Sequence, residues 1–170
     1  FSSDPVNQIR EGAAFVYHGP LAGIGSAASW RAESDQANAV LGTSVASAGD
    51  VNGDGYADVI VGAPGATKGQ TKEGATFVFH GSDTGLGATA NWTVESNQGE
   101  AGLGWSVATA GDINADGFED VIVGVPYYSN GQVNEGAAFV YHGSASGLSG
   151  SAPLPSGPAP KPDWRAESDQ

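Results

Sequence analysis

The sequence predicts an all-β fold built from repeated units of four short antiparallel strands. A segment that begins Glu11-Gly-Ala recurs at Glu73 and again at Glu135, so each step is 62 residues long. Val- and Ile-rich runs alternate with turn residues, and Gly supplies 27 of the 170 residues. The sequence has no sustained run of the helix-favouring residues Ala, Leu, Glu, Lys and Arg. Four strand candidates in a repeat of this length are typical of the blades of a β-propeller.

The first two strands of a unit are expected at residues 43–48 and 58–62. The first consists of small and β-branched residues, which suit a crowded place where several sheets converge. The second is a short continuous Val/Ile run, as expected for a strand that is covered on both faces. Pro64 follows it, and Pro126 stands at the same place one repeat later. Because proline cannot donate to the strand ladder, we expect both strands to end there.

The third and fourth strands of a unit are marked by aromatic residues. Residues 13–18 carry Phe and Tyr in alternation with smaller side chains, a pattern that favours a strand. The fourth strand begins at Trp30, and its counterparts begin at Trp92 and Trp164. It is more polar than the others, so we expect it at the outer edge of the sheet. We interpret the three recurring Trp side chains as packing residues of the repeat.

The repeats divide the chain into two complete blades and a half blade. Residues 1–36 carry only the third and fourth strands, whereas residues 37–98 and 99–170 each carry all four. The last blade contains an insertion, residues 144–162, that is rich in Pro, Ser and Gly and is expected to form an extended surface loop. Two and a half blades cannot close a ring. We therefore expect the chain to be a fragment of a longer protein or a protomer that other copies complete.

Each complete blade contains an acidic turn between its first two strands, at residues 50–58 and 112–120. Both turns read Asp-x-Asn-x-Asp-Gly-aromatic-x-Asp, with oxygen-bearing side chains at positions 1, 3, 5 and 9. Calcium prefers about six to eight oxygen ligands, so this pattern indicates a calcium loop. The turns are not EF-hands, because Val61 and Val123 stand at the twelfth positions, where an EF-hand has Glu.

Composition and charge disfavour several classes of function. The formal net charge is −13, which argues against nucleic acid and anionic membranes as partners. Without Cys, the chain has neither a disulfide framework nor a thiolate for zinc or catalysis. No apolar stretch is long enough to insert into a bilayer. No nucleophile motif and no phosphate-binding Gly loop is present, so we expect no enzyme activity. The Gly-, Ser-, Thr- and Asn-rich composition without Cys or Met favours an extracellular protein.

The two complete blades resemble the FG-GAP repeat of the integrin α-subunit propeller and of its bacterial and fungal relatives. The positions that give this repeat its name match residues 41–42 with 62–64, and residues 103–104 with 124–126. Leu replaces Phe in both copies, and Val125 replaces Ala in the second. The resemblance implies a propeller in which certain blades bind calcium between their first two strands.

The resemblance also implies the ligands of two calcium ions per chain. The implied side-chain ligands are Asp50, Asn52, Asp54 and Asp58 in the first turn, and Asp112, Asn114, Asp116 and Asp120 in the second. The peptide oxygens of Tyr56 and Phe118 are the implied backbone ligands. We expect the calcium to be structural, because it offsets the repulsion of clustered carboxylates and fixes the turn.

The function implied by the resemblance is adhesion or protein–protein interaction by a secreted or cell-surface protein. Its partners would be a protein ligand or other copies of the chain, with glycans as a further class. Three alternatives stay open. In the first, the chain assembles with other copies into a ring or fibre whose blades are completed between copies. In the second, it is a carbohydrate-binding propeller like some fungal lectins. In the third, it is an accessory domain of a hydrolase such as certain phospholipases.

Two further sets of residues carry weaker signals. His18, His80 and His142 recur at the end of the third strand. Because their spacing puts each on a different blade, we interpret them as strand-end residues copied with the repeat, and not as a metal cluster. Trp105 replaces Thr43 at a first-strand position and is expected to be exposed at the face of the ring.

Overall fold

The computed structural model describes residues 9–19, 25–150 and 161–167, which contain ten β-strands and no helix. The strands are β1 (Ala13–Val16), β2 (Trp30–Glu33), β3 (Ser44–Gly49), β4 (Asp58–Ala63), β5 (Ala75–Phe79), β6 (Trp92–Glu95), β7 (Ser106–Gly111), β8 (Asp120–Val125), β9 (Ala137–Tyr141) and β10 (Trp164–Glu167).

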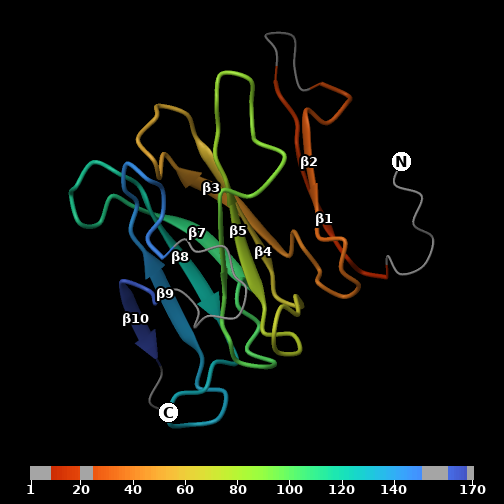
Figure 1. Cartoon of the computed structure of the whole chain (residues 1–170), viewed down its shortest axis with the longest axis vertical. Coiled ribbons are helices and arrows are strands. Elements are labelled where there is room, and N and C mark those ends of the chain that lie inside the picture. The colour runs from red at the N-terminus through yellow and green to blue at the C-terminus, as the bar shows by residue number, and fades with distance from the viewer. Residues whose placement is uncertain (1–8, 20–24, 151–160, 168–170) are drawn as a thin grey trace.

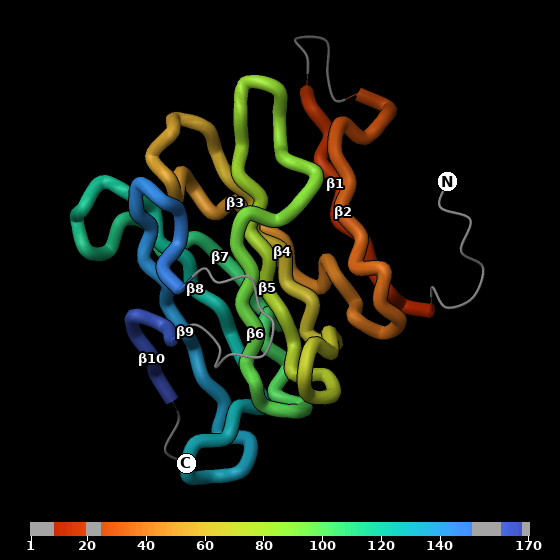
Figure 2. The backbone as a smooth tube through the Cα atoms, viewed as in Figure 1, coloured from red at the N-terminus to blue at the C-terminus, as the bar shows by residue number. Residues whose placement is uncertain are grey.

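The strands form three antiparallel sheets that lie side by side (Figure 1). Two sheets have four strands each, in the orders β3-β4-β5-β6 and β7-β8-β9-β10, and the third consists of β1 and β2. Figure 2 shows β1–β2 on one flank of this row and β10 on the other. The described sheets form an open row and not a closed ring. This arrangement confirms the predicted all-β fold of four-stranded antiparallel blades in an incomplete ring.

The predicted strands agree with the observed ones to within two residues. β3 is shifted by one residue from the range 43–48, and β4 extends one residue beyond the range 58–62. β1 ends at Val16 and not at residue 18. β4 and β8 end immediately before Pro64 and Pro126, as expected, because proline has no N–H for the ladder.

The first strands of the two complete blades meet at a crowded crossing. The backbone N–H of Val107 in β7 donates to the Ser44 hydroxyl of β3 at 3.1 Å. Close by, a Cβ atom added to Gly62 would lie only 2.0 Å from the carbonyl oxygen of Gly104. A side chain at Gly62 of β4 is therefore excluded at this crossing.

Two apolar clusters fill the spaces between adjacent sheets. One lies between the two four-stranded sheets, where the rings of Trp92 and Tyr141 meet edge to face with centroids 5.0 Å apart. The other lies between β1–β2 and the next sheet, where Trp30 and Phe79 meet at 4.8 Å. These two Trp side chains pack as expected. Trp164, on the outer strand β10, is exposed.

β6 lies at the edge of its sheet, as expected, and is nevertheless buried. It is an edge strand of its sheet, but Trp92, Val94 and Glu95 are all buried. The reason is that the apolar cluster between the two four-stranded sheets includes Trp92 and Val94. The neighbouring blade thus covers this predicted edge strand.

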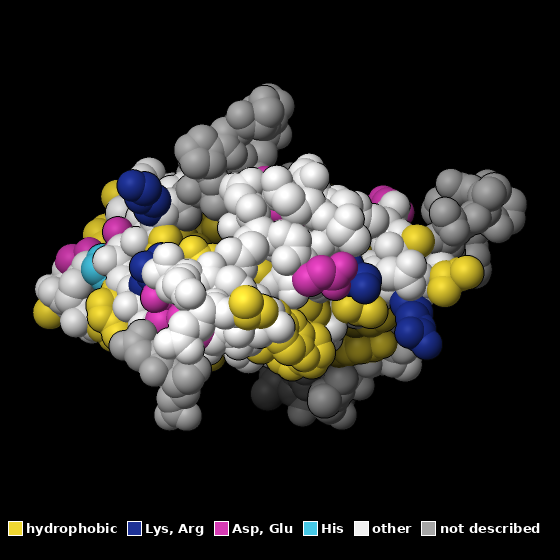
Figure 3. All heavy atoms as spheres, turned by 90° about the horizontal axis from the view of Figure 1, so that it is seen from below, with side chains coloured by type: hydrophobic (Ala, Val, Ile, Leu, Met, Phe, Trp, Pro, Cys, Tyr) yellow, Lys and Arg dark blue, Asp and Glu magenta, His cyan; other side chains and the backbone are white. Residues whose placement is uncertain are grey.

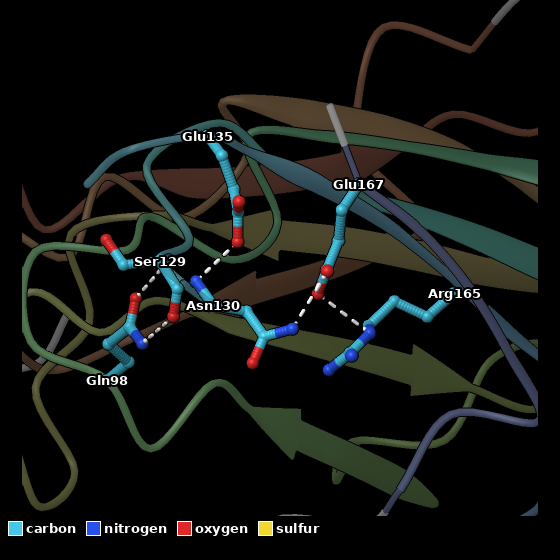
Figure 4. A network of polar contacts seen from close by, with 6 residues as sticks. All are labelled: Gln98, Ser129, Asn130, Glu135, Arg165 and Glu167. Carbon is cyan, nitrogen blue, oxygen red and sulfur yellow. Dashed lines mark hydrogen bonds and ion pairs between the residues drawn. The ribbon is translucent and has the colours of Figure 1, made fainter. Parts of the chain in front are cut away.

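Successive blades are joined by hydrogen bonds that recur one repeat later. The Trp30 indole N–H donates to the Gly87 carbonyl at 2.8 Å, and the Trp92 indole donates to Ser149 at 3.0 Å. The amide of Gln98 exchanges two bonds with the Ser129 backbone (Figure 4), and Gln36 makes the same pair with Thr67. Parallel bridges, Gly12 to Leu41 and Gly74 to Leu103, repeat in the same way. The blades are therefore stacked by one common interface.

The blade limits at residues 36 and 98 fall between β2 and β3 and between β6 and β7. Residues 151–160 of the expected insertion lie outside the described part of the chain. None of the described residues forms a helix that is long and apolar enough to cross a bilayer. On the face drawn in Figure 3, Lys and Arg side chains are scattered singly and form no continuous basic surface.

Candidate metal centres in two repeated loops

The two acidic turns lie at the same end of their sheets. Loop one (residues 50–58) connects β3 to β4, and loop two (residues 112–120) connects β7 to β8. Each follows an irregular step in strand register, between Ser47 and Gly49 in the first blade. In each loop the last Asp is already the first residue of a strand, so the loop is anchored at both ends.

In loop one, three side chains turn inward onto the backbone of the turn. Asp50 Oδ1 and Asn52 Oδ1 both accept the N–H of Asp54, at 3.0 and 3.1 Å. Asp50 Oδ2 accepts the N–H of Gly55 at 2.9 Å, and Asp54 Oδ1 accepts that of Tyr56 at 2.9 Å. Gly55 has φ of 88°, the positive value expected for a tight turn at glycine. The loop thus gathers its oxygen atoms around one concave stretch of backbone.

Asp58 closes the base of loop one. Its carboxylate is buried and accepts the N–H groups of Val51 at 3.0 Å and Gly81 at 2.8 Å. Burial raises the pKa of the Asp58 carboxyl, and the two backbone hydrogen bonds oppose that rise. The pKa of Asp54 is lowered, chiefly by the hydrogen bond from the Tyr56 N–H. The loop therefore pairs a solvated carboxylate with a buried one.

Loop two repeats this geometry. Asp112 Oδ1 and Asn114 Oδ1 both accept the N–H of Asp116, at 3.0 and 3.1 Å. Asp120 is buried and accepts two backbone N–H groups at 2.9 Å each. Gly117 has φ of 92°. The same residue pattern thus gives the same loop at both places.

The donor atoms of each loop fit calcium by their chemistry. They are carboxylate and amide oxygens, the ligands preferred by a hard cation, and no sulfur or imidazole is among them. Among the described residues, no three acidic or histidine side chains converge as a ready-made metal cluster. The carboxylates are instead engaged by backbone N–H groups, which leave further lone pairs on every oxygen. Tyr56 and Phe118 follow the left-handed glycines, and their N–H groups donate to Asp54 and Asp116.

One residue near loop one was not anticipated as part of the site. The Asn52 side-chain nitrogen lies 3.3 Å from Nδ1 of His80. His80 directly follows β5, so it is a strand-end residue as interpreted from the sequence. The end of the third strand lies beside the turn between the first two, because neighbouring strands are antiparallel. That adjacency is the signal that could have linked His80 to the loop.

These observations define a class of protein: a repeat protein of four-stranded β blades, with an acidic loop between the first two strands of each complete blade. Residues 41–79 and 103–141 each match the family model described as FG-GAP repeat. The chain belongs to the FG-GAP repeat family.

The chain is similar to several curated proteins. It is 43% identical over 88 residues to "Integrin alpha pat-2" of Caenorhabditis briggsae. The matched region is 49% of this chain and 7% of that protein. It is 36% identical over 99 residues to "Integrin alpha-7" of Rattus norvegicus, with 58% of this chain and 8% of that protein covered. It is also 36% identical over 116 residues to "Phosphatidylinositol-glycan-specific phospholipase D" of Rattus norvegicus, with 63% and 14% covered. The chain thus spans a small part of the length of these relatives.

Proposed function

We propose that this chain is a calcium-binding segment of an extracellular or cell-surface β-propeller that acts in adhesion or protein–protein interaction. The observation that carries the proposal is the coincidence of two FG-GAP repeats with two loops of matching oxygen geometry. The similarity to integrin α subunits supports the adhesion role.

Each loop would hold one calcium ion. The residues that would hold it are Asp50, Asn52, Asp54, Asp58 and the Tyr56 peptide oxygen in loop one, and Asp112, Asn114, Asp116, Asp120 and the Phe118 peptide oxygen in loop two. When bound, the ion neutralises clustered carboxylates and fixes the turn. The N–H of the left-handed Gly55 donates to the Asp50 carboxylate, and His80 lies within hydrogen-bond distance of the Asn52 amide.

A protein partner is favoured over enzymatic activity. The phospholipase D relative shares only 14% of its length with this chain, and the sequence has no catalytic motif. The exposed rings of Trp105 and Tyr127 meet edge to face with centroids 5.9 Å apart. They lie where β7 begins and β8 ends, opposite loop two. Aromatic residues are enriched in protein interfaces, so this pair is a suitable contact surface.

Thermal unfolding tests the calcium proposal. We expect the wild-type chain to melt at a higher temperature in millimolar calcium than in EDTA, because an ion that binds only the folded state adds about 2.7 kcal/mol per site at a hundredfold excess over Kd. Asp54→Ala and Asp116→Ala should each lose part of this gain, measured as the difference between the melting temperatures of each variant in calcium and in EDTA. Asp83→Ala, an exposed acidic position outside both loops, is the control and should keep the full gain. Identical wild-type melting in calcium and in EDTA would refute the proposal.

One observation favours self-assembly as a second candidate function. Phe15 and Tyr17 are 50% and 49% exposed, whereas Phe79 and Tyr141, the counterparts of Tyr17, are 4% and 1% exposed. In the described part of the chain β1 pairs only with β2, and a groove of about 510 Å³ lies between β1 and the β3–β4 pair. A free strand edge beside an apolar groove is suited to pairing with a strand from another molecule.

A further inference from the structure

We propose that the peptide group between Phe118 and Glu119 couples the two calcium sites, so that an ion bound in one loop strengthens binding in the other. The inference rests on the proposed calcium binding and goes beyond it. It assigns a positioning role to Glu119, which is not one of the expected ligands.

Loop two packs directly against loop one. The Glu119 N–H donates to the Asp50 carbonyl at 3.2 Å, and the Ser144 N–H donates to the Val51 carbonyl at 3.1 Å. Val51 is consequently 0% exposed, whereas Ile113, its counterpart in loop two, is 55% exposed. The two loops therefore form one continuous structure.

Side chains reinforce this contact. A Cβ atom at Gly53 would lie 2.6 Å from the Phe118 ring, and one at Gly49 would lie 2.5 Å from the Glu119 side chain. The Glu119 carboxylate also accepts a hydrogen bond from the Thr109 hydroxyl at 3.1 Å. Glu119 is thus held between Thr109 of β7 and Gly49 of β3. Gly49 at the end of β3 and Gly53 of loop one provide the space that this packing needs.

A single planar peptide group connects loop two to the backbone of loop one. Its carbonyl belongs to Phe118, the expected backbone ligand of loop two. Its N–H belongs to Glu119 and donates to the backbone carbonyl of Asp50, whose side chain is an expected ligand of loop one. Because a peptide group is rigid, fixing one end fixes the orientation of the other. An ion that immobilises Asp50 therefore pre-orients a ligand of loop two and lowers the entropy cost of the second binding event. Linkage makes the effect reciprocal.

Site-resolved calcium titration of the full chain tests the coupling. The backbone amides of Gly55 and Gly117 report on loops one and two separately in ¹⁵N-labelled protein. Asp54→Asn disables loop one without adding bulk, and we expect calcium affinity at loop two to fall about fivefold or more, the lower end of typical couplings between sites. Asp116→Asn should weaken loop one by the same factor.

A variant that separates the loops without replacing a ligand residue isolates the mechanism. Gly53→Ala places a methyl group against the Phe118 ring. Loop two already carries Ala115 at this position and keeps the same hydrogen bonds, so Ala is compatible with the loop itself. In the Gly53→Ala background, Asp54→Asn should no longer change affinity at loop two. Ala115→Gly is the matched control and should leave the coupling intact.

The possible outcomes are distinguishable. Binding at both loops, with each affinity unchanged when the other loop is disabled, would overturn the coupling and leave the calcium proposal standing. Stronger binding at loop two when loop one is disabled would also overturn it, because repulsion between the ions would then dominate. No calcium response at either glycine would overturn both proposals.

Discussion

Ala115 occupies a backbone conformation that usually belongs to glycine. Its φ is 60°, and the equivalent residue in loop one is Gly53, with φ of 71°. A left-handed conformation costs an L-residue about 1–2 kcal/mol, of which the greater chain entropy of an unfolded glycine offsets a part. We expect Ala115→Gly to raise the free energy of unfolding by roughly 0.5–1 kcal/mol. Urea unfolding in EDTA measures this without a contribution from calcium.

The opposite change in loop one, Gly53→Ala, should destabilise the fold by more than the left-handed strain alone. Gly53→Ala adds the left-handed penalty and a clash with the Phe118 ring. We expect it to lower the free energy of unfolding by about 2 kcal/mol or more. Equal and opposite effects of the two substitutions would show that the ring contact contributes nothing to stability.

Glu95 is a buried carboxyl that lacks the arginine found beside its counterparts Glu33 and Glu167. It is 5% exposed, and its Oε2 has no hydrogen-bond partner among the described residues. At the equivalent place in the last blade, Arg165 pairs with Glu167 at 2.8 Å (Figure 4). Thr93 stands where that arginine would be. Burial raises the pKa of Glu95, and the charge of Glu73 adds to the rise.

This raised pKa predicts a pH dependence of stability. The folded state holds the Glu95 proton more tightly than the unfolded state, so the contribution of Glu95 to stability is greatest when it is protonated. It falls as pH rises above the ordinary carboxyl value of 4.5 and through the higher pKa of the folded state. We expect Glu95→Gln to remove this component and to be more stable than the wild type at neutral pH. Urea unfolding at several pH values checks this, and an unchanged pH profile would contradict it.

At the level of strands, two equivalent glycines face different neighbours. A Cβ atom on Gly62 in β4 would meet the Gly104 carbonyl oxygen at 2.0 Å. On Gly124 in β8 it would meet the Ser106 hydroxyl at 2.3 Å, and that hydroxyl can rotate away. We expect Gly62→Ala to cost about 3 kcal/mol of unfolding free energy and Gly124→Ala about 1 kcal/mol or less. Denaturant unfolding of the two variants measures both losses of unfolding free energy. Equal losses would show that the contact between Gly62 and Gly104 is not the cause.

The strands themselves were predictable because local signals coincided with the repeat. The Val/Ile run of β4 and the proline after it define that strand without knowledge of its neighbours. Burial of β6 was not predictable, because it depends on the blade that packs over it. The same limit applies to the site. The acidic residues of the loops follow from spacing, whereas the contacts of His80 and Glu119 depend on the placement of strands and blades.

The molecule as a whole is an open row of sheets with apolar side chains at its ends. Phe15 and Tyr17 are exposed at one end, and Trp164 is exposed at the other. We expect the average mass measured by light scattering to rise with protein concentration, because such edges associate. Phe15→Ser together with Tyr17→Ser should suppress the rise. A wild-type chain that stays monomeric with and without chelator would rule out self-assembly.

The indole bonds that link one blade to the next have an evolutionary consequence. Trp30 and Trp92 donate to equivalent acceptors across two successive interfaces between blades, so both interfaces use the same contact. A gene encoding such a chain can gain or lose whole segments by unequal recombination while every remaining boundary stays complementary. A substitution at one of these tryptophans that spread to all copies would remove the hydrogen bond at every interface between blades. Selection against that combined loss would keep the copies alike.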